Sequence, residues 1–271
     1  MPELPEVETT RRGLQPLLEG RMIDHAVVRN RAMRRPVPRI LPGALHDTRL
    51  ERIARRGKYL LFECTSGTLI IHLGMSGRLW AVAKDTLPER HDHFDLVMAD
   101  GTTVRLRDPR RFGLVLWQRG DGLDHPLLRQ IGPEPLAPEF DGTALHAALS
   151  GLTCAVKLAL MDSHRIAGIG NIYASEALFR ARINPRTAAG RVSLARCEVL
   201  AREIKHTLQR AIRAGGSSLR DYVGSDGKAG YFQSEFKVYG RGGEPCMSCA
   251  APIRSIVQGQ RATYYCARCQ R

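Results

Sequence analysis

The sequence predicts an α+β protein of several domains: an N-terminal β-sandwich that begins with a helix, a helical domain, and a small C-terminal β-hairpin that holds a metal ion. Three observations predict this fold class. Short apolar runs rich in β-branched residues fill the first part of the chain. A 3.6-residue apolar period replaces them after a stretch rich in proline and glycine. Two Cys-x2-Cys pairs follow near the end.

The first element is a helix over the segment PEVETTRRGLQPLLEG. Pro5 suits a first helical turn, and Gly20 supplies a stop. Glu6 and Glu8 are acidic residues close to the positive end of the helix dipole. One face of the helix is apolar and predicted to be buried, with Val7, Leu14 and Leu18.

Apolar runs then predict strands over AVV, KYLLFE, TLIIHLGM, FDLVMA, TTVRLR and GLVLW. Ser66-Gly67 and Asp100-Gly101 lie between such runs and are typical of hairpin turns. We therefore assign residues 2–131 to the N-terminal helix and β-sandwich.

The stretch GPEPLAPEFDG contains too much proline and glycine for a regular element, so residues 132–150 are predicted to be a linker. Residues 151–236 follow as a helical domain, with helices over AVKLALMDS, NIYASEALFRARI and SLARCEVLAREIKHTLQRAIRAGG. The glycine-rich stretch 215–243 predicts a flexible loop that can close over a ligand. The longest helix carries one apolar stripe of Leu194, Cys197, Leu200, Ile204, Leu208 and Ile212.

The charge balance favours a polyanionic partner. The chain has 41 basic and 27 acidic residues, a net charge of +14, which favours nucleic acid over a membrane surface, although a generic basic protein gives the same balance. No apolar run reaches the ~18 residues of a membrane span, and the start MPELPEVE does not resemble a secretory signal. We therefore expect a cytoplasmic protein whose cysteines bind metal or fill the core.

The C-terminal cysteines have the spacing of a zinc site. Cys246-x2-Cys249 and Cys266-x2-Cys269 are separated by sixteen residues. Four thiolates in two tight turns can surround one tetrahedral Zn²⁺, and a site filled entirely by protein is structural; the alternative is four thiols without a metal. The intervening IRSIVQGQRATYYC predicts two short strands, so residues 237–271 form a zinc-finger hairpin. Its arginines either offset the thiolate charge or contact phosphates.

Three further motifs carry possible chemistry, and each has a purely structural alternative. In GIGNIYASEAL, Gly168 and Gly170 lead into a helix whose N-terminal N–H groups can bind phosphate, or they permit a close helix crossing. After removal of Met1, Pro2 would present a secondary amine with a pKa near ~8, which can attack a sugar C1′ with Glu3 as acid or base; the alternative is an ordinary N-terminus.

The third motif combines basic residues with apolar wedges. Lys58 in RRGKYLL, Met75 in HLGMSGRL, and the run Arg110, Arg111 and Phe112 suit a protein that flips a base out of a duplex and fills the vacated stack; the alternative is core packing with solvated arginines. His91 and His93 make a poor metal site without a third ligand, so phosphate contact or solvation is favoured. Three cysteines are predicted to be packed free thiols: Cys64, Cys154 and Cys197.

Taken together, these motifs resemble the formamidopyrimidine-DNA glycosylases, the bacterial 8-oxoguanine DNA glycosylases of the helix-two-turn-helix type. PELPEVET, GKYLL, IHLGMSG, DPRRFG, GIGNIYASE and the two CxxC pairs follow the family order from Pro2 to Arg271. The resemblance implies a helix-two-turn-helix second domain, one structural zinc, and double-stranded DNA with oxidised bases, held in a cleft between domains. It also implies a bacterial, nucleoid-associated protein; a monomer is the simplest expectation.

The resemblance also implies residue roles. Pro2 would be the Schiff-base nucleophile and Glu3 would assist base release. Lys58 would donate a proton for β-elimination and Arg261 would serve δ-elimination. Residues implied to contact DNA are His72, Met75, His91, Arg110, Phe112, Lys157, Asn171 and Arg220.

Two departures and two alternatives accompany this assignment. Arg220 stands in SSLRDY where relatives often have lysine, and LSGLTCAVK has fewer lysines than some relatives before Lys157, so lesion range and phosphate contacts are less firmly implied. Endonuclease VIII, which prefers oxidised pyrimidines, typically begins PEGPE, and Leu4 favours the purine branch. A DNA-binding protein without catalysis is the second alternative, against which PELPE and Lys58 argue.

Overall fold

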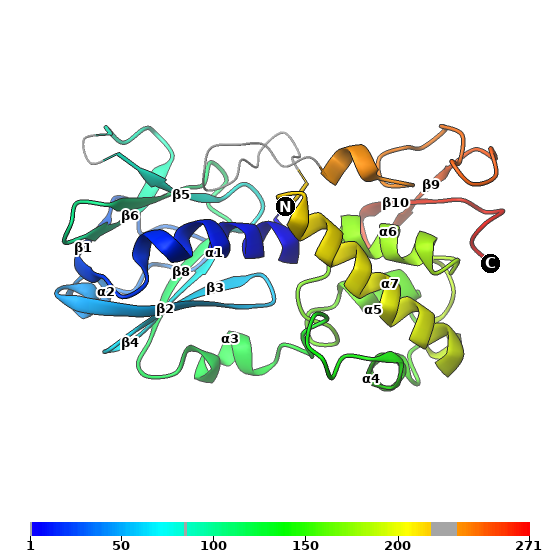
Figure 1. The fold of residues 1–271 in the computed structure, drawn as a ribbon, viewed down its shortest axis with the longest axis horizontal. Helices are drawn as coiled ribbons and strands as arrows, with labels where there is room; N and C mark the ends of the chain where they lie inside the picture. Colours follow the sequence, from blue (N-terminus) through cyan, green and yellow to red (C-terminus); the bar gives the residue numbers. More distant parts are fainter. Residues whose placement is uncertain (1, 84–85, 218–231) are drawn as a thin grey trace. The chain divides into compact units, whose positions relative to one another are not determined.

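The structure is a computed structural model that describes residues 2–83, 86–217 and 232–271 (Figure 1). The chain divides into two compact units. The first contains Met1–Gln130 and Ala214–Tyr231, and the second contains Ile131–Arg213 and Phe232–Arg271. Among the described residues, no helix has both the length and the apolar character that a membrane span requires.

The predicted first helix is α1, Leu4–Leu18. Proline in its first turn and a capping box between Glu3 and Glu6 explain where it begins. Gly20, at φ +80°, follows its end, as predicted. The predicted apolar face is buried.

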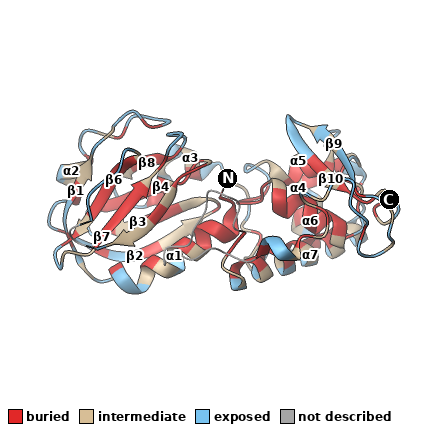
Figure 2. Ribbon diagram, turned by 90° about the horizontal axis from the view of Figure 1, so that it is seen from above, coloured by how far each residue is buried: buried red, intermediate tan, exposed pale blue. Residues whose placement is uncertain are grey.

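One eight-stranded antiparallel sheet forms the main part of the first unit. Its order is β5-β7-β6-β1-β2-β3-β4-β8, and only two residue pairs join β1 to β2. The sheet therefore folds into two halves over one core, to which strands of both halves and α1 contribute (Figure 2). This confirms the predicted β-sandwich. The strands are β1 (Met22–Val28), β2 (Thr48–Arg56), β3 (Tyr59–Cys64), β4 (Gly67–His72), β5 (Arg78–Val82), β6 (Asp92–Met98), β7 (Thr103–Arg107) and β8 (Leu114–Gln118).

The strands β2 and β5 are absent from the predicted set: TRLERIARR contains four arginines, and RLWAV is a run of only five residues that begins with an arginine. In the structure, ion pairs satisfy charges of β2: Arg52 pairs with Glu63 at 2.8 Å and Arg55 with Glu8 at 3.2 Å. In β5, the ring of Trp80 lies 5.3 Å from the guanidinium carbon of Arg107 on β7. Short helical segments also lie in this unit: α2 (Leu41–Leu45), η1 (Gly122–Asp124) and α3 (Pro126–Arg129).

The second unit is helical with a terminal hairpin, as predicted. The helix α4, Gly142–Leu149, lies inside the stretch 132–150 that was predicted to be a linker, and the Asp141 side chain caps it by accepting the Ala144 N–H at 2.8 Å. The predicted stripe of α7 is buried except for Leu194, which is 43% exposed because it begins the helix. The remaining elements are α5 (Val156–Met161), α6 (Asn171–Arg180), η2 (Ala189–Arg191), α7 (Leu194–Arg213), η3 (Phe232–Glu235), β9 (Arg254–Gln258) and β10 (Arg261–Tyr265).

Two of the three thiols predicted to be packed are buried. Burial raises the pKa of Cys64 to about 12 and that of Cys197 to about 11, so both are inert at neutral pH. The prediction is wrong for Cys154, which is exposed. Its backbone carbonyl accepts the Ala189 N–H at 2.8 Å, which fixes the backbone while the side chain faces solvent. Residues 218–231 of the predicted loop 215–243 lie outside the described residues.

A buried carboxylate joins α1 to the sheet. Glu8 is 7% exposed and accepts hydrogen bonds from Arg11 at 2.9 Å, Arg12 at 2.7 Å and Arg55 at 3.2 Å. Burial opposes its ionisation, but these guanidinium groups outweigh burial and lower the pKa of Glu8 to about 2.

We expect Glu8→Gln to lower the free energy of unfolding by about 2–3 kcal/mol at pH 7. Because the pKa of Glu8 in the folded protein lies below the ordinary 4.5, its contribution is present above that pH and is lost as the pH falls toward 2. Urea unfolding of the unaltered protein and of Glu8→Gln at several pH values measures how the difference between their free energies of unfolding decreases as the pH falls. Glu63→Gln, which breaks the exposed pair with Arg52, is the matched control and should cost about 1 kcal/mol or less.

Candidate functional site

The start of α1 places three predicted residues together. Pro2 and Glu3 are both buried, and Glu3 is the N-cap of the helix. The backbone N–H of Glu3 donates to Oε2 of Glu6 at 2.8 Å. The nitrogen of Pro2 is therefore attached to a backbone that the capping box holds in place.

Glu6 also holds a distant segment of the chain. Its Oε1 accepts both the backbone N–H of Ser217 at 2.8 Å and the Ser217 hydroxyl at 2.9 Å. Gly216 has φ +85°, and a Cβ there would lie 3.2 Å from the same oxygen. This segment directly precedes the undescribed residues 218–231, which contain Arg220, so the predicted position of Arg220 lies outside the described residues. No local pattern predicts the Ser217 contact, because 211 positions separate Ser217 from Glu6.

Lys58 lies in the two-residue turn between β2 and β3, beside Gly57 at φ +56°. Arg55 connects this turn to α1: its Nη1 donates to the Gly57 carbonyl at 2.9 Å and its Nε to Glu8 at 3.2 Å. One ion pair thus couples the helix that carries Pro2 to the turn that carries Lys58.

His72 ends β4 in a defined protonation state. Its Nδ1 accepts the backbone N–H of Gly74 at 2.9 Å, so the neutral ring carries its proton on Nε2. Burial lowers the pKa of His72 to about 3, helped by the positive charges of Lys58 and Arg34. His72 therefore offers an uncharged N–H donor at neutral pH.

The predicted wedge residues lie on two loops that one carboxylate holds together. Asp108 is fully buried; it accepts the Ser76 hydroxyl at 2.7 Å with Oδ1 and the Gly113 N–H at 2.7 Å with Oδ2. Ser76 follows Met75, and Gly113 follows Phe112. Asp108 therefore fixes both loops, a role that the DPRRFG motif did not reveal.

The exposed surface of these loops has the predicted composition. Phe112 is 42% exposed, and the guanidinium carbon of Arg110 lies 4.6 Å from its ring centre. Met75 is half-buried. Gly74, at φ +64°, has no room for a side chain because a Cβ would lie 2.4 Å from the Phe112 backbone. The structure thus brings Met75, Arg110 and Phe112 together.

The two histidines of RHDHFD have different environments. His93 is buried, and its Nε2 lies 3.0 Å from the Asp108 carbonyl. His91 is half-buried at a ring distance of 6.4 Å from His93. Neither belongs to a metal-ligand cluster among the described residues.

In the second unit, Lys157 holds the hairpin that carries Arg261. Lys157 is fully buried; its Nζ donates to Oδ1 of Asn171 at 2.5 Å, Oγ1 of Thr263 at 2.5 Å and the Ala262 carbonyl at 3.2 Å. The side chain of Asn171 also donates to the Ala262 carbonyl at 3.0 Å. Arg261, next in the chain, is exposed. The N-terminus of α6 and the start of β10 are therefore linked by one buried ammonium group.

The four predicted zinc ligands converge. Their sulfur atoms all lie within 4.8 Å of one another, with Cys246 to Cys269 at 3.9 Å and Cys249 to Cys266 at 3.4 Å. A tetrahedral site with Zn–S bonds of about 2.3 Å needs sulfur separations of about 3.8 Å. Burial and the other three thiols raise the pKa of Cys269 to about 12, so a cation is needed for all four to ionise. The residues fit one structural Zn²⁺.

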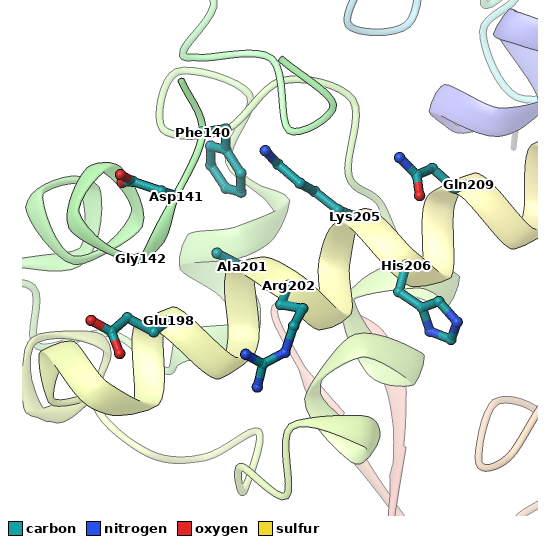
Figure 3. Close-up of a pocket in the computed structure, with 9 residues that line it drawn as sticks. All are labelled: Phe140, Asp141, Gly142, Glu198, Ala201, Arg202, Lys205, His206 and Gln209. Atoms are coloured by element: carbon teal, nitrogen blue, oxygen red, sulfur yellow. The ribbon is translucent and has the colours of Figure 1, made fainter. Parts of the chain in front are cut away.

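A cavity of about 470 Å³ lies elsewhere in the second unit, between Phe140 and α7 (Figure 3). Its wall includes Lys205, whose Nζ donates to the Ala137 carbonyl at 2.8 Å. None of the predicted site residues that the structure describes lines it.

Comparison with known families covers most of the chain. Residues 1–115 match the formamidopyrimidine-DNA glycosylase N-terminal domain, residues 131–223 match the helix-two-turn-helix domain of the same glycosylases, and residues 243–271 match a zinc finger found in these proteins and in isoleucyl-tRNA synthetases. The chain belongs to the formamidopyrimidine-DNA glycosylase family. This confirms the resemblance drawn from the motifs.

Individual members of the formamidopyrimidine-DNA glycosylase family are similar over the full length. The protein of that name from Methylobacillus flagellatus is 54% identical over 270 residues, covering 100% of this chain and 96% of the relative. The one from Aromatoleum aromaticum is 53% identical, with both chains covered completely.

Solved structures of the family have the same fold. The MutM (Fpg) protein of Thermus thermophilus has a TM-score of 0.89 at 38% identity, covering 99% of this chain and 98% of that chain. A Lactococcus lactis Fpg mutant, bound to DNA containing Fapy-dG, has a TM-score of 0.91 at 35% identity, with 99% of each chain covered. The fold class and the one structural zinc are thereby supported.

Proposed function

We propose that this protein excises oxidised purines, 8-oxoguanine and formamidopyrimidines, from double-stranded DNA and then cleaves the strand, as a bifunctional glycosylase and AP lyase. The observation that carries the proposal is the start of α1, where the carboxylate of Glu6 accepts the backbone N–H of Glu3, the residue directly after Pro2. The proposed setting is bacterial nucleoid DNA.

The chemistry follows from a secondary amine. The nitrogen lone pair of Pro2 forms a bond to C1′ while the bond from C1′ to the base breaks, and Glu3 supports the proton transfer that accompanies base release. The sugar ring then opens to an iminium ion, which cannot lose an N–H and so acidifies C2′–H. The carboxylate of Glu3 is proposed to take that proton; the electrons of the C2′–H bond form the C2′–C3′ double bond and expel the 3′ phosphate, to which Lys58 donates a proton. A second elimination, served by Arg261, removes the C4′ proton and expels the 5′ phosphate. Water then hydrolyses the iminium, which frees the Pro2 amine and leaves a one-nucleoside gap.

The remaining predicted residues would bind the duplex. Met75, Arg110 and Phe112 would fill the space that the flipped nucleotide vacates. Because His72 is neutral, it would bind phosphate as a hydrogen-bond donor without adding to the salt dependence of binding. His91 and Asn171 are proposed as further phosphate contacts, and Arg220 rests on the family resemblance alone.

The experiment that tests this function compares two lesions in otherwise identical duplexes. We expect release of 8-oxoguanine opposite cytosine to exceed release of thymine glycol. Release of thymine glycol alone would assign the protein to the endonuclease VIII-like alternative. Tight binding of both duplexes without excision of either would support a non-catalytic DNA-binding protein.

Lys157 provides a sharper test of the DNA-binding surface. We propose that Lys157 acts by positioning Asn171 and the hairpin, because its ammonium group is fully buried. Lys157→Met should weaken DNA binding about tenfold, since it leaves buried acceptors without donors. The slope of log K against log salt should stay unchanged.

Binding titrations at several salt concentrations separate the two possible roles of Lys157. A lysine that touched phosphate would lower the salt slope by about one on removal, and that outcome would overturn the positioning role. Lys205→Met, which removes another lysine that binds a backbone carbonyl of the same unit, is the control and should bind DNA as the unaltered protein does.

A further inference from the structure

The zinc site has a charged neighbour that no motif identifies. Arg180 is the last residue of α6, and its Nε and Nη2 are buried without a hydrogen-bond partner. Only four side-chain atoms of the described residues are in this condition, and two of them belong to this guanidinium. A buried N–H without an acceptor costs about 1–3 kcal/mol, so this group calls for a physical explanation.

Arg180 lies in the wall of a cavity that reaches both Cys-x2-Cys turns of the zinc site. We call residues 246–249 the first knuckle and residues 266–269 the second knuckle. The cavity has a volume of about 240 Å³; Ser248 of the first knuckle and Cys269 of the second line it together with Arg180 and Arg182. The adjacent Phe179 packs in one apolar cluster with the buried Cys246 and Cys266. The end of α6 is thus part of the surroundings of the metal site.

The chain around Arg180 is fixed to the second knuckle. The carbonyl of Arg182 accepts the Arg271 N–H at 3.3 Å, and the carbonyl of Ile183 accepts Nε2 of Gln270 at 2.9 Å. Oε1 of Gln270 in turn accepts the N–H of Cys266 at 2.9 Å. Arg180 therefore cannot easily move away from the cysteines.

The charges explain why an arginine belongs here. Four thiolates around one Zn²⁺ carry a net charge of −2, and zinc-bound sulfur accepts hydrogen bonds from N–H groups. The backbone N–H of Ser248 already donates to Sγ of Cys246 at 3.4 Å. Among the described residues that line the cavity, Glu203 is the one carboxylate, against the two guanidinium groups of Arg180 and Arg182.

We propose that Arg180 is an outer-sphere partner of the zinc tetrathiolate, offsetting its negative charge and slowing the loss of zinc. The proposal concerns metal retention and does not depend on the excision reaction. Outer-sphere partners of metal sites change metal affinity by about 10–100-fold. Arginine suits the role because its guanidinium keeps its charge when it is partly desolvated.

The test uses the full-length, zinc-loaded protein and follows zinc transfer to a chromogenic chelator. Arg180→Met should release zinc about 10–100-fold faster. Arg180→Lys keeps the charge but not the planar donors, so it should release zinc at a rate between those of the unaltered protein and Arg180→Met. Arg202→Met removes one exposed positive charge from the same unit and should release zinc at the unaltered rate. Equal starting zinc content and equal unfolding temperature confirm that each variant is folded.

Two results would overturn the proposal. Zinc release from Arg180→Met and Arg180→Lys at the unaltered rate would show that the guanidinium does not serve the metal. Stabilisation of the unaltered protein by inorganic phosphate, lost in both variants while zinc release stays constant, would instead make the cavity an anion site.

Discussion

A preparation that retains Met1 is expected to form no covalent complex with DNA under borohydride, whereas processed protein forms one at Pro2. With Met1 present, the Pro2 nitrogen is a tertiary amide, which has no basic lone pair to attack C1′. Strand cleavage at an 8-oxoguanine opposite cytosine should fall by at least about 10³-fold, since loss of a nucleophile removes the whole covalent route. Peptide mapping of the trapped complex identifies the attached residue.

The matched variant is Glu3→Gln in processed protein. It leaves the Pro2 amine intact, so trapping on DNA with a preformed abasic site should persist while release of 8-oxoguanine falls. Equal DNA binding by Glu3→Gln and by the unaltered processed protein shows that the lower release of 8-oxoguanine reflects a loss of chemistry and not of binding. If processed protein gave no adduct with any lesion despite firm binding, the nucleophile assignment would fail and the non-catalytic alternative would hold.

Cys249→Ser should lose zinc and DNA binding together. Zinc binding contributes on the order of 10 kcal/mol to the folding of such modules, and a serine hydroxyl does not replace a thiolate ligand. The hairpin also carries Ala262 and Thr263, which accept hydrogen bonds from Lys157. Its collapse therefore removes both Arg261 and the support of Asn171. Metal content and DNA affinity of the same samples measure the effect.

The first unit should remain folded in this variant, because its core is separate from the zinc module. Cys154→Ser is the control: it removes an exposed thiol from the same unit and should keep both zinc and DNA binding. Tight DNA binding by metal-free Cys249→Ser would contradict the structural role of zinc.

Local patterns predicted those parts of the fold whose signals lie within a few residues. The N-terminal helix, the apolar strands and the zinc hairpin all carry such signals. Strand β2 was missed because its arginines look like a solvated segment until Glu8 and Glu63, distant in sequence, pair with them. The helix α4 was not predicted because the proline-rich segment directly before it indicates a linker over the whole of residues 132–150.

The candidate site likewise contains residues that local motifs predict and residues that they do not. The two CxxC pairs predicted the zinc ligands, which the structure brings together, and the short motifs of the N-terminal part named the candidate catalytic residues. The residues that hold the motifs in position were not predictable, because their partners come from elsewhere in the chain: Ser217 binds Glu6, and Asp108 binds Ser76. Burial of Lys157 was likewise not visible, since a lysine in the first turn of a helix ordinarily faces solvent.

The shared carboxylate of Asp108 has an energetic consequence for the wedge. Because the Asp108 carboxylate accepts a hydrogen bond from each loop, displacement of one loop disturbs the hydrogen bond that holds the other. Met75 and Phe112 should then behave as one thermodynamic unit: removing the second side chain after the first costs less than removing it alone. Natural variation at one loop is consequently constrained by the residue that occupies the other.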